Sequence, residues 1–398
     1  MNSIFIQMKK LIFALITLGI GTFAYGQYTP KGKVSKAETA FNQNKLDIAK
    51  AEVDKAFEVN AKGKVTGSAK NWYTRGRIYK AIYLDDSTDF KDLAPKEEAL
   101  ETAMEAFSKV KEMEKQTSTY VIFTDQEVSQ LYGMIVNEGA EKYNDNDFKG
   151  AYNDFMTALV VSPGDTTALL YGGVSAQQAE MYDEALGAFQ QLVDNGDANL
   201  DTYKTMIYLY RTEKEDMERV LKVVNQGLEK FPSNKELTQE KITSLIIMER
   251  VDEAKSELEG AIAAEPTNSL YYYFLGYLYD VQKDPDKSIE NYSKAVELNP
   301  EYYEANYNLA VVYYEKARSV LSELNNLSLE EYRKQESAYM EKAAVHFKEA
   351  LPYFEKAVEI KPDEDVQLLE TLQGVYLRLH MNDKAEALDG KIKALSGQ

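Results

Sequence analysis

The sequence holds few residues of the kinds that perform enzyme chemistry. Its only histidines are His346 and His380, on separate predicted helices and without the H-E-x-x-H motif of a zinc site. Cysteine is absent, which excludes thiol catalysis, disulfides and cysteine metal sites. No glycine-rich phosphate-binding motif occurs. We interpret both histidines as surface or packing residues, and expect no catalytic residue, cofactor or metal ion.

The segment from Asn144 to Asp147 (N-D-N-D) offers the oxygen ligands that calcium prefers. Phe148 and Ala151 follow it in an apolar helical pattern, so the segment falls at a turn between two helices. We therefore predict that Asp147 caps the second helix instead of binding a cation. The 65 acidic residues allow so many carboxylate pairs that none of them indicates acid–base catalysis.

The composition and the proline spacing predict a chain of repeated helices. Hydrophobic residues make up 44% of the 398 positions, whereas proline and glycine number only nine and 21. Pro232, Pro266 and Pro300 are spaced 34 residues apart, and each follows an apolar helical pattern. A period of this length is typical of repeats that consist of two helices.

The residues inside the period resemble the tetratricopeptide repeat, in which antiparallel helices A and B pack together and a proline follows helix B. In one period the family positions fall on Tyr272, Leu275, Gly276, Tyr279, Ser288, Tyr292 and Ala295, and an earlier helix A repeats them at Trp72, Gly76 and Tyr79. The helix B signature recurs at Ala151/Phe155/Ala158, Ala185/Phe189/Leu192, Ala254/Leu258/Ala261 and Ala350/Phe354/Ala357. The resemblance implies an all-α, right-handed superhelical solenoid of about nine antiparallel helix pairs.

The predicted pairs lie at approximately 34–60, 70–112, 128–162, 166–194, 199–231, 234–265, 268–299, 303–361 and 364–395. They give a weak N-terminal pair with a flexible linker (27–69), a repeat array (70–300), a repeat with elongated helices (301–362) and a C-terminal capping pair (363–398). We also expect a loop from Asp85 to Glu98, a capping box of Ser328 and Glu331, and a kink at Pro352. Gly276 should lie where helix A crosses helix B.

The resemblance further implies where a partner would bind, because in this family helix A lines the inner face of the superhelix. By that register the groove residues are Tyr73, Arg77, Lys80, Tyr273, Tyr277, Tyr307 and Tyr314. Tyrosine and arginine bind well at interfaces, but tyrosine also fills cores, and both roles stay open here. The insertion at 319–349 is the other candidate surface. A carboxylate clamp of the kind some relatives use is not expected, since Tyr307 and Val311 occupy positions around Asn308.

The N-terminus predicts export. Lys9 and Lys10 precede an apolar run and a small-residue site before Gln27, which is the pattern of a signal peptide over 1–26, with Met1 or Met8 as the start. The run is shorter than a membrane helix needs, so we expect a chain that does not span the membrane. We expect it in the periplasm, with peripheral attachment to the outer membrane as an option. The net charge of -19 makes nucleic acid a poor partner.

These patterns favour a non-enzymatic scaffold or adaptor that binds proteins of the bacterial envelope, such as an outer-membrane complex. A carrier of a small nutrient is the alternative, because some nutrient-binding lipoproteins use similar repeats, although the lipidated cysteine is missing here. An enzyme with an unrecognised site is a third hypothesis, which the lack of catalytic motifs disfavours. The identity of the partner and the formation of a homo-oligomer stay open.

Overall fold

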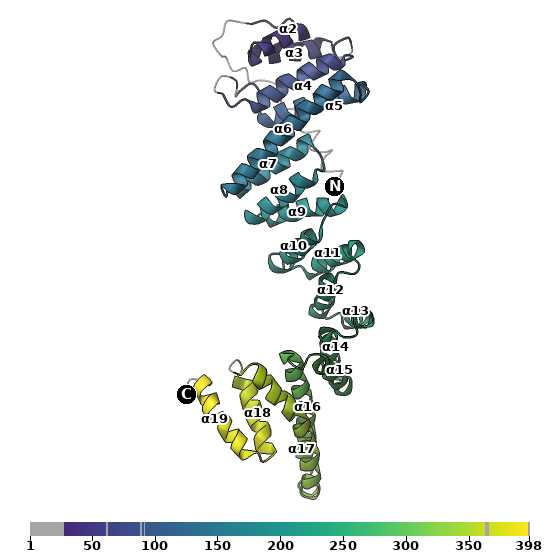
Figure 1. The fold of residues 1–398 in the computed structure, drawn as a ribbon, viewed down its shortest axis with the longest axis vertical. Coiled ribbons are helices and arrows are strands. Elements are labelled where there is room, and N and C mark those ends of the chain that lie inside the picture. Colours follow the sequence, from purple (N-terminus) through teal and green to yellow (C-terminus); the bar gives the residue numbers. More distant parts are fainter. Residues whose placement is uncertain (1–27, 61–62, 88–89, 91, 363–365, 397–398) are drawn as a thin grey trace. The chain divides into compact units, whose positions relative to one another are not determined.

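The computed structural model describes residues 28–60, 63–87, 90, 92–362 and 366–396. The described residues form 18 α-helices and no strand, which confirms the predicted all-α fold (Figure 1). The chain divides after Ala198 into two units, which we call unit 1 and unit 2 and describe separately. The predicted signal peptide, 1–26, lies outside the described residues.

The described part of unit 1 consists of four helix pairs, in each of which helix A packs against the helix B that follows it. The pairs are α2 (Val34–Asn42) with α3 (Leu46–Val59), α4 (Ala69–Leu84) with α5 (Lys96–Met113), α6 (Thr119–Asn144) with α7 (Phe148–Val161), and α8 (Thr166–Gln178) with α9 (Tyr182–Asp194). Between α4 and α5, the described residues 85–87, 90 and 92–95 are not helical, as the sequence predicted, but Lys96 to Glu98, which were predicted in the loop, already belong to α5.

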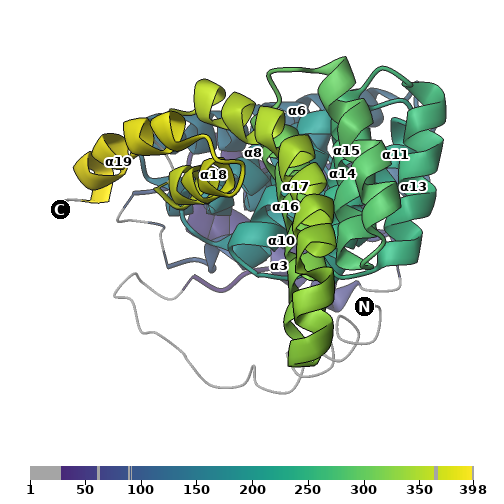
Figure 2. The same ribbon diagram turned by 90° about the horizontal axis from the view of Figure 1, so that it is seen from below.

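Unit 2 continues the pattern with five pairs among its described residues. They are α10 (Leu200–Thr212) with α11 (Met217–Lys230), α12 (Lys235–Ile247) with α13 (Val251–Ala264), α14 (Ser269–Val281) with α15 (Pro285–Leu298), α16 (Tyr303–Asn325) with α17 (Leu329–Ile360), and α18 (Val366–Arg378) with α19 (Asn382–Ser396). The predicted helix pairs are thereby confirmed. Helices α16 and α17 extend beyond the ends of α14 and α15 (Figure 2).

In three pairs, a glycine of helix A lies against a large side chain of helix B. A Cβ atom on Gly173 would lie 2.5 Å from the ring of Phe189, closer than van der Waals contact permits. The same contact recurs at 2.5 Å for Gly76 with Phe107 and at 2.7 Å for Gly276 with Tyr292. The nearest neighbour of Gly276 at the predicted crossing of the two helices is therefore the ring of Tyr292.

In two pairs of unit 2, helix A packs against helix B without a glycine at this position. The eighth residue of helix A, which is glycine in α4, α8 and α14, is Ile207 in α10 and Ile242 in α12. Val224 and Leu258 are the buried helix B residues of these pairs, where the three glycine-containing pairs have Phe or Tyr. A larger residue in one helix thus accompanies a smaller one in the other, which keeps the packed volume similar.

The start of α6 differs from the prediction. The sequence placed the third pair from residue 128, but α6 begins at Thr119 and so includes about two and a half further turns of helix. Val121 in this added part is fully buried against Val110, with Trp72 and Tyr120 packed around them. The added part lacks the glycine and tyrosine positions of a repeat, so the repeat pattern does not detect it.

Several local predictions are confirmed by the hydrogen bonds. The Asp147 carboxylate accepts from the backbone N–H of Gly150 at 3.0 Å, so Asp147 caps α7. Ser328 and Glu331 form the predicted capping box of α17. Helix α17 is one helix through Pro352 to Ile360, and the kink expected at Pro352 stays a prediction.

The predicted linker forms turns over its described part. The backbone N–H of Gly67 donates to the carbonyl of Gly63 at 3.2 Å. The side chains of Asn71 and Trp72 in α4 donate to the carbonyls of Val65 and Thr66 at 3.1 and 2.9 Å.

A buried carboxylate holds the first described residues against α3. Glu52 is fully buried and accepts hydrogen bonds from the Tyr28 hydroxyl and from the backbone N–H groups of Lys31 and Lys33, the last two at 3.1 and 2.9 Å. Burial alone would raise the pKa of Glu52, but the hydrogen bonds from Tyr28, Lys33 and Lys31 outweigh it and lower that pKa. The carboxylate therefore fastens the chain that enters the first helix pair.

Replacing Glu52 with glutamine should weaken the first pair by roughly 1–2 kcal/mol, because two charge-assisted bonds to backbone N–H groups are lost. Since the folded-state pKa is lowered, this contribution is present at neutral pH and is lost as the pH falls below the normal glutamate range. Hydrogen exchange of α2 and α3 measures the effect. Glu58→Gln, on the exposed side of the same helix, is the control; an equal effect of both changes would contradict the role of Glu52.

Candidate functional site

The predicted groove residues share one register, the fifth, ninth and twelfth positions of helix A. In α4 these are Tyr73, Arg77 and Lys80. Positions separated by four and three residues lie on one side of a helix, so we call this side of each helix A its A-face. The structure places the predicted residues of the A-faces in three different environments.

In unit 1, the three predicted residues converge on Glu127 of α6. The Lys80 ammonium lies 2.6 Å from the Glu127 carboxylate and 3.2 Å from its backbone carbonyl, and Arg77 Nε lies 3.3 Å from the carboxylate. The Tyr73 hydroxyl donates to Glu127 at 3.4 Å. Lys80 is only 7% exposed. The added part of α6 thus covers the A-face of α4 with the chain's own carboxylate.

Aromatic contacts complete this covered site. The Tyr73 ring centre lies 5.8 Å from that of Tyr120 and 6.1 Å from that of Phe123, both in the added part of α6. Burial and the charge of Glu127 raise the pKa of Tyr73. The sequence did not reveal this site, because its key residue, Glu127, lies just before the predicted start of the third pair.

In unit 2, the A-face of α14 divides into a half-buried and an exposed tyrosine. Tyr273 lies against Tyr302 and Tyr292, with ring centres 5.1 and 5.7 Å away, and accepts a hydrogen bond from the Asn308 amide at 3.4 Å. Burial, followed by the charge of Glu304, raises the pKa of Tyr273. Tyr277, one turn further along, is 38% exposed.

The two predicted tyrosines of α16 contribute mainly to packing. Tyr314 meets the rings of Phe347 and Phe354 of α17 edge-on, at centre distances of 5.6 and 6.1 Å. Tyr307 stacks on Tyr303 at 6.0 Å. Tyr314 therefore fills the core, whereas the Tyr277 side chain is partly exposed to solvent.

A further A-face in unit 2 was missed. Lys204, Tyr208 and Arg211 of α10 occupy the same three positions as the α4 set and have the same residue types in another order. Tyr208 is 52% exposed. The sequence register was set by the glycine of helix A, which α10 lacks, so these three residues were not predicted. Their positions relative to the first residue of the helix, Leu200, are the signal that identifies them.

These α10 residues line a hollow of about 270 Å³ together with residues of α12. Lys204 pairs with Glu236, and Arg211 with Glu240, so two ion pairs join the helices across it. Burial lowers the pKa of Arg211. The hollow offers an exposed tyrosine ring between charged groups of both signs, which suits a peptide better than a reacting substrate.

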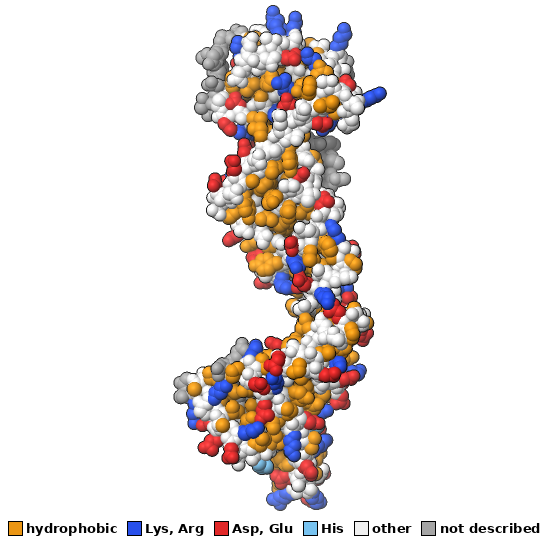
Figure 3. Space-filling model, in the orientation of Figure 1, with side chains coloured by type: hydrophobic (Ala, Val, Ile, Leu, Met, Phe, Trp, Pro, Cys, Tyr) orange, Lys and Arg blue, Asp and Glu red, His pale blue; other side chains and the backbone are white. Residues whose placement is uncertain are grey.

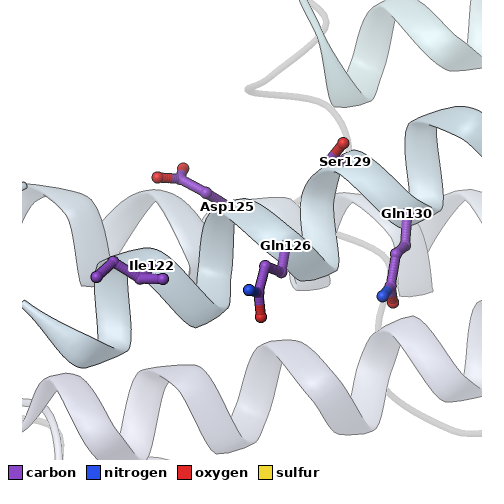
Figure 4. A pocket seen from close by; sticks show the side chains of 5 residues that line it. All are labelled: Ile122, Asp125, Gln126, Ser129 and Gln130. Atoms are coloured by element: carbon purple, nitrogen blue, oxygen red, sulfur yellow. The ribbon is translucent and has the colours of Figure 1, made fainter.

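Another hollow, of about 440 Å³, lies on α6 alone and is lined by Ile122, Asp125, Gln126, Ser129 and Gln130. Figure 4 shows that Asp125 and Ser129 point to one side of the helix and Gln126 and Gln130 to the other. Since these side chains do not converge, the hollow has no centre at which they could act together.

The other chemical groups are dispersed. His346 Nδ1 lies 2.8 Å from Glu349 on the same helix, and His380 has a positive φ of 58° in the turn between α18 and α19. Within the described ranges, no group of three or more His, Asp or Glu side chains could hold a metal ion.

Among the described helices, none combines the length and the apolar character that a membrane span requires. On the side drawn in Figure 3, acidic and basic side chains are interspersed with hydrophobic ones.

Family models match unit 2. A "TPR repeat" model matches residues 282–316, and a "Tetratricopeptide repeat" model matches residues 242–296. Among curated proteins, the human protein O-mannosyl-transferase TMTC3 is 23% identical over 191 residues, which are 44% of this chain. The match spans only 21% of the length of the human protein.

Three solved structures are similar to parts of this chain. The MamA protein is 18% identical over 49% of this chain and 90% of its own, with a TM-score of 0.37. YrrB, described as a TPR protein with an unusual peptide-binding site, is 21% identical over 51% of this chain and 97% of its own, with a TM-score of 0.34. A TPR repeats protein from Bacteroides fragilis NCTC 9343 is 18% identical over 66% of this chain and 98% of its own, with a TM-score of 0.32.

The matched repeats and the helix pairs agree with each other. The family models cover α13 to α15 and parts of their neighbours, and the glycine-to-aromatic contact of α14 with α15 recurs in unit 1 at α4 with α5 and at α8 with α9. Repeats of this kind support protein–protein interaction. Residues 242–316 of this chain are therefore tetratricopeptide repeats, a kind of repeat that supports a protein-interaction scaffold.

Proposed function

We propose that this protein is a non-catalytic scaffold of the bacterial cell envelope, and that it binds a segment of a partner protein on the A-faces of unit 2. The observation that carries the proposal is the contrast between the units. The A-face of α4 is covered by Glu127 and its neighbours, whereas Tyr208 of α10 and Tyr277 of α14 are 52% and 38% exposed.

Exposed tyrosines suit partner binding for physical reasons. A tyrosine ring buries a large area, loses few rotamers and carries a hydroxyl that can bond to a peptide backbone. Helix packing already holds the α14 backbone in place through Gly276 and the fully buried Tyr292. A partner segment would then meet an ordered surface and lose less entropy on binding than it would at a mobile loop.

The envelope setting is supported by the signal-peptide pattern over 1–26 and by the lack of cysteine. Cell fractionation with mass spectrometry of the N-terminus tests it. We expect the protein in the periplasmic fraction, with Gln27 as its first residue. A cytoplasmic protein that retains residues 1–26 would contradict this setting.

Capture of partners from envelope extracts tests the binding site. A partner retained by the wild-type protein at a constant ratio should be lost from a variant with Tyr208→Ala and Tyr277→Ala. Tyr171→Ala is the control, because Tyr171 is an equally exposed tyrosine outside the A-face register. Equal retention by both variants would contradict binding on these faces. A small solute that raises the melting temperature, with no protein captured, would favour a carrier instead.

A further inference from the structure

The A-face of α14 combines aromatic rings with carboxylates and has no basic side chain of its own. Helix α14 contains no Lys or Arg, and Asp280 lies one turn after Tyr277 on the same side. Asp280 forms no ion pair with a described residue. From α16, the charge of Glu304 acts on Tyr273 and the charge of Glu315 on Asp280. We call the set of these residues the tyrosine–carboxylate face: Tyr273, Tyr277, Asp280, Glu304 and Glu315.

The charges of this face do not cancel. Arg318 lies 2.7 Å from Glu315, and Lys361 lies 4.0 Å from Glu304, so both α16 carboxylates have a cation beside them. Asp280 has none. Burial, followed by the charge of Glu315, raises the pKa of Asp280. One negative charge therefore stays unbalanced next to the exposed ring of Tyr277.

Tyrosine rings nearby already bind ammonium groups of the chain itself. The Lys255 ammonium lies 3.9 Å from the ring centre of Tyr279, on another side of α14. Lys361 lies 4.3 Å from the ring centre of Tyr303, beside Glu304. Both contacts are cation–π pairs, and the second shows a ring and a carboxylate that share one cation. The tyrosine–carboxylate face offers the same two groups at Tyr277 and Asp280.

We infer that the tyrosine–carboxylate face recognises a Lys or Arg side chain of a basic partner segment, with the cation between Tyr277 and Asp280. This inference rests on the proposed function and adds the charge of the partner to it. The cation would balance the charge of Asp280 and lie on the Tyr277 ring. By contrast, the A-face of α4 has its cations already paired with Glu127.

A synthetic peptide of alternating lysine and serine is a suitable probe, with binding measured by calorimetry at physiological ionic strength. Asp280→Asn should weaken its binding about tenfold, because a charge-assisted contact is lost. Asp280→Glu, which keeps the charge, should bind within a few-fold of the wild-type protein. Helicity and melting temperature confirm that each variant is folded.

The control removes the same charge elsewhere. Glu290 lies exposed on α15 and forms no ion pair with a described residue. Glu290→Gln therefore removes one negative charge, as Asp280→Asn does. General attraction to an acidic protein would make Glu290→Gln and Asp280→Asn equivalent, which would overturn the inference. If the peptide binds both variants as tightly as the wild-type protein, but capture of the envelope partner still requires Tyr277, the scaffold function stands and the inference of a basic partner is wrong. If, in addition, capture of the envelope partner does not require Tyr277, both proposals are contradicted.

Discussion

Replacing Gly173 with isoleucine should destabilise unit 1 by about 3 kcal/mol, because even the Cβ atom would lie 2.5 Å from the Phe189 ring. Phe189 is 1% exposed and has no space into which to move. The two helices of the pair would have to separate or rotate. Pulse proteolysis and hydrogen exchange of α8 and α9 measure the loss locally, which is necessary because repeat arrays do not unfold in one step.

Gly187 provides the matched control for this substitution. It lies exposed within α9, and a Cβ atom there would meet nothing within 4 Å. Gly187→Ile should therefore stabilise its helix by about 0.5 kcal/mol, since isoleucine has the better helix propensity. If both substitutions have the same effect, the contact of glycine with phenylalanine does not determine how close the helices pack.

The chain itself suggests a compensating change. Helices α10 and α11 combine Ile207 with Val224, so a variant with both Gly173→Ile and Phe189→Val should regain at least half of the lost stability. A coupling energy of about 1–3 kcal/mol between the two sites is expected, as is usual for residues in direct contact. Simple additivity of the two changes would contradict this interpretation of the repeats.

Tyr292→Ala should cost unit 2 about 4 kcal/mol, the largest effect expected of a single substitution. The Tyr292 ring is fully buried, lies against Gly276 and packs with Leu309 and Val312 of α16, so its removal leaves a cavity between successive pairs. The Asn308 amide, 3.3 Å from the Tyr292 hydroxyl, loses a partner as well. Hydrogen exchange should show faster opening of α14, α15 and α16 together.

Tyr277→Ala is the control for this cavity. Because Tyr277 is partly exposed, its loss should change stability by less than about 1 kcal/mol. The pair of variants thus separates the packing tyrosine from the one proposed to bind. A stability loss at Tyr277 as large as that at Tyr292 would mean that both rings serve the core, and the binding experiments would then need the hydroxyl variant Tyr277→Phe.

The repeat signal predicted the fold well because it follows from packing. A proline follows helix B in five of the nine described pairs, and a small residue often faces a large one where two helices cross closely, so the pattern is visible in a single chain. Local caps such as Asp147 and Ser328 were predictable for a similar reason, since a side chain that bonds to the backbone a few residues later needs no tertiary context.

The candidate site was predicted less completely, because it depends on contacts between repeats. The register correctly gives the side of α4 on which Lys80 lies, but no repeat pattern reveals that Glu127 of α6 reaches it. Nor does the register separate Tyr314, which packs on Phe347, from the exposed Tyr277, as both occupy A-face positions. The extent to which each ring is buried depends on the neighbouring helix, which the pattern of one repeat does not contain.

Site-specific photo-crosslinking in cells tests whether a partner protein lies on the A-faces of unit 2. A photoreactive phenylalanine in place of Tyr277 should give a defined adduct with another protein, and the same group at Glu290 on α15 should not. An adduct from position 290 and none from position 277 would place the partner on helix B and contradict the account.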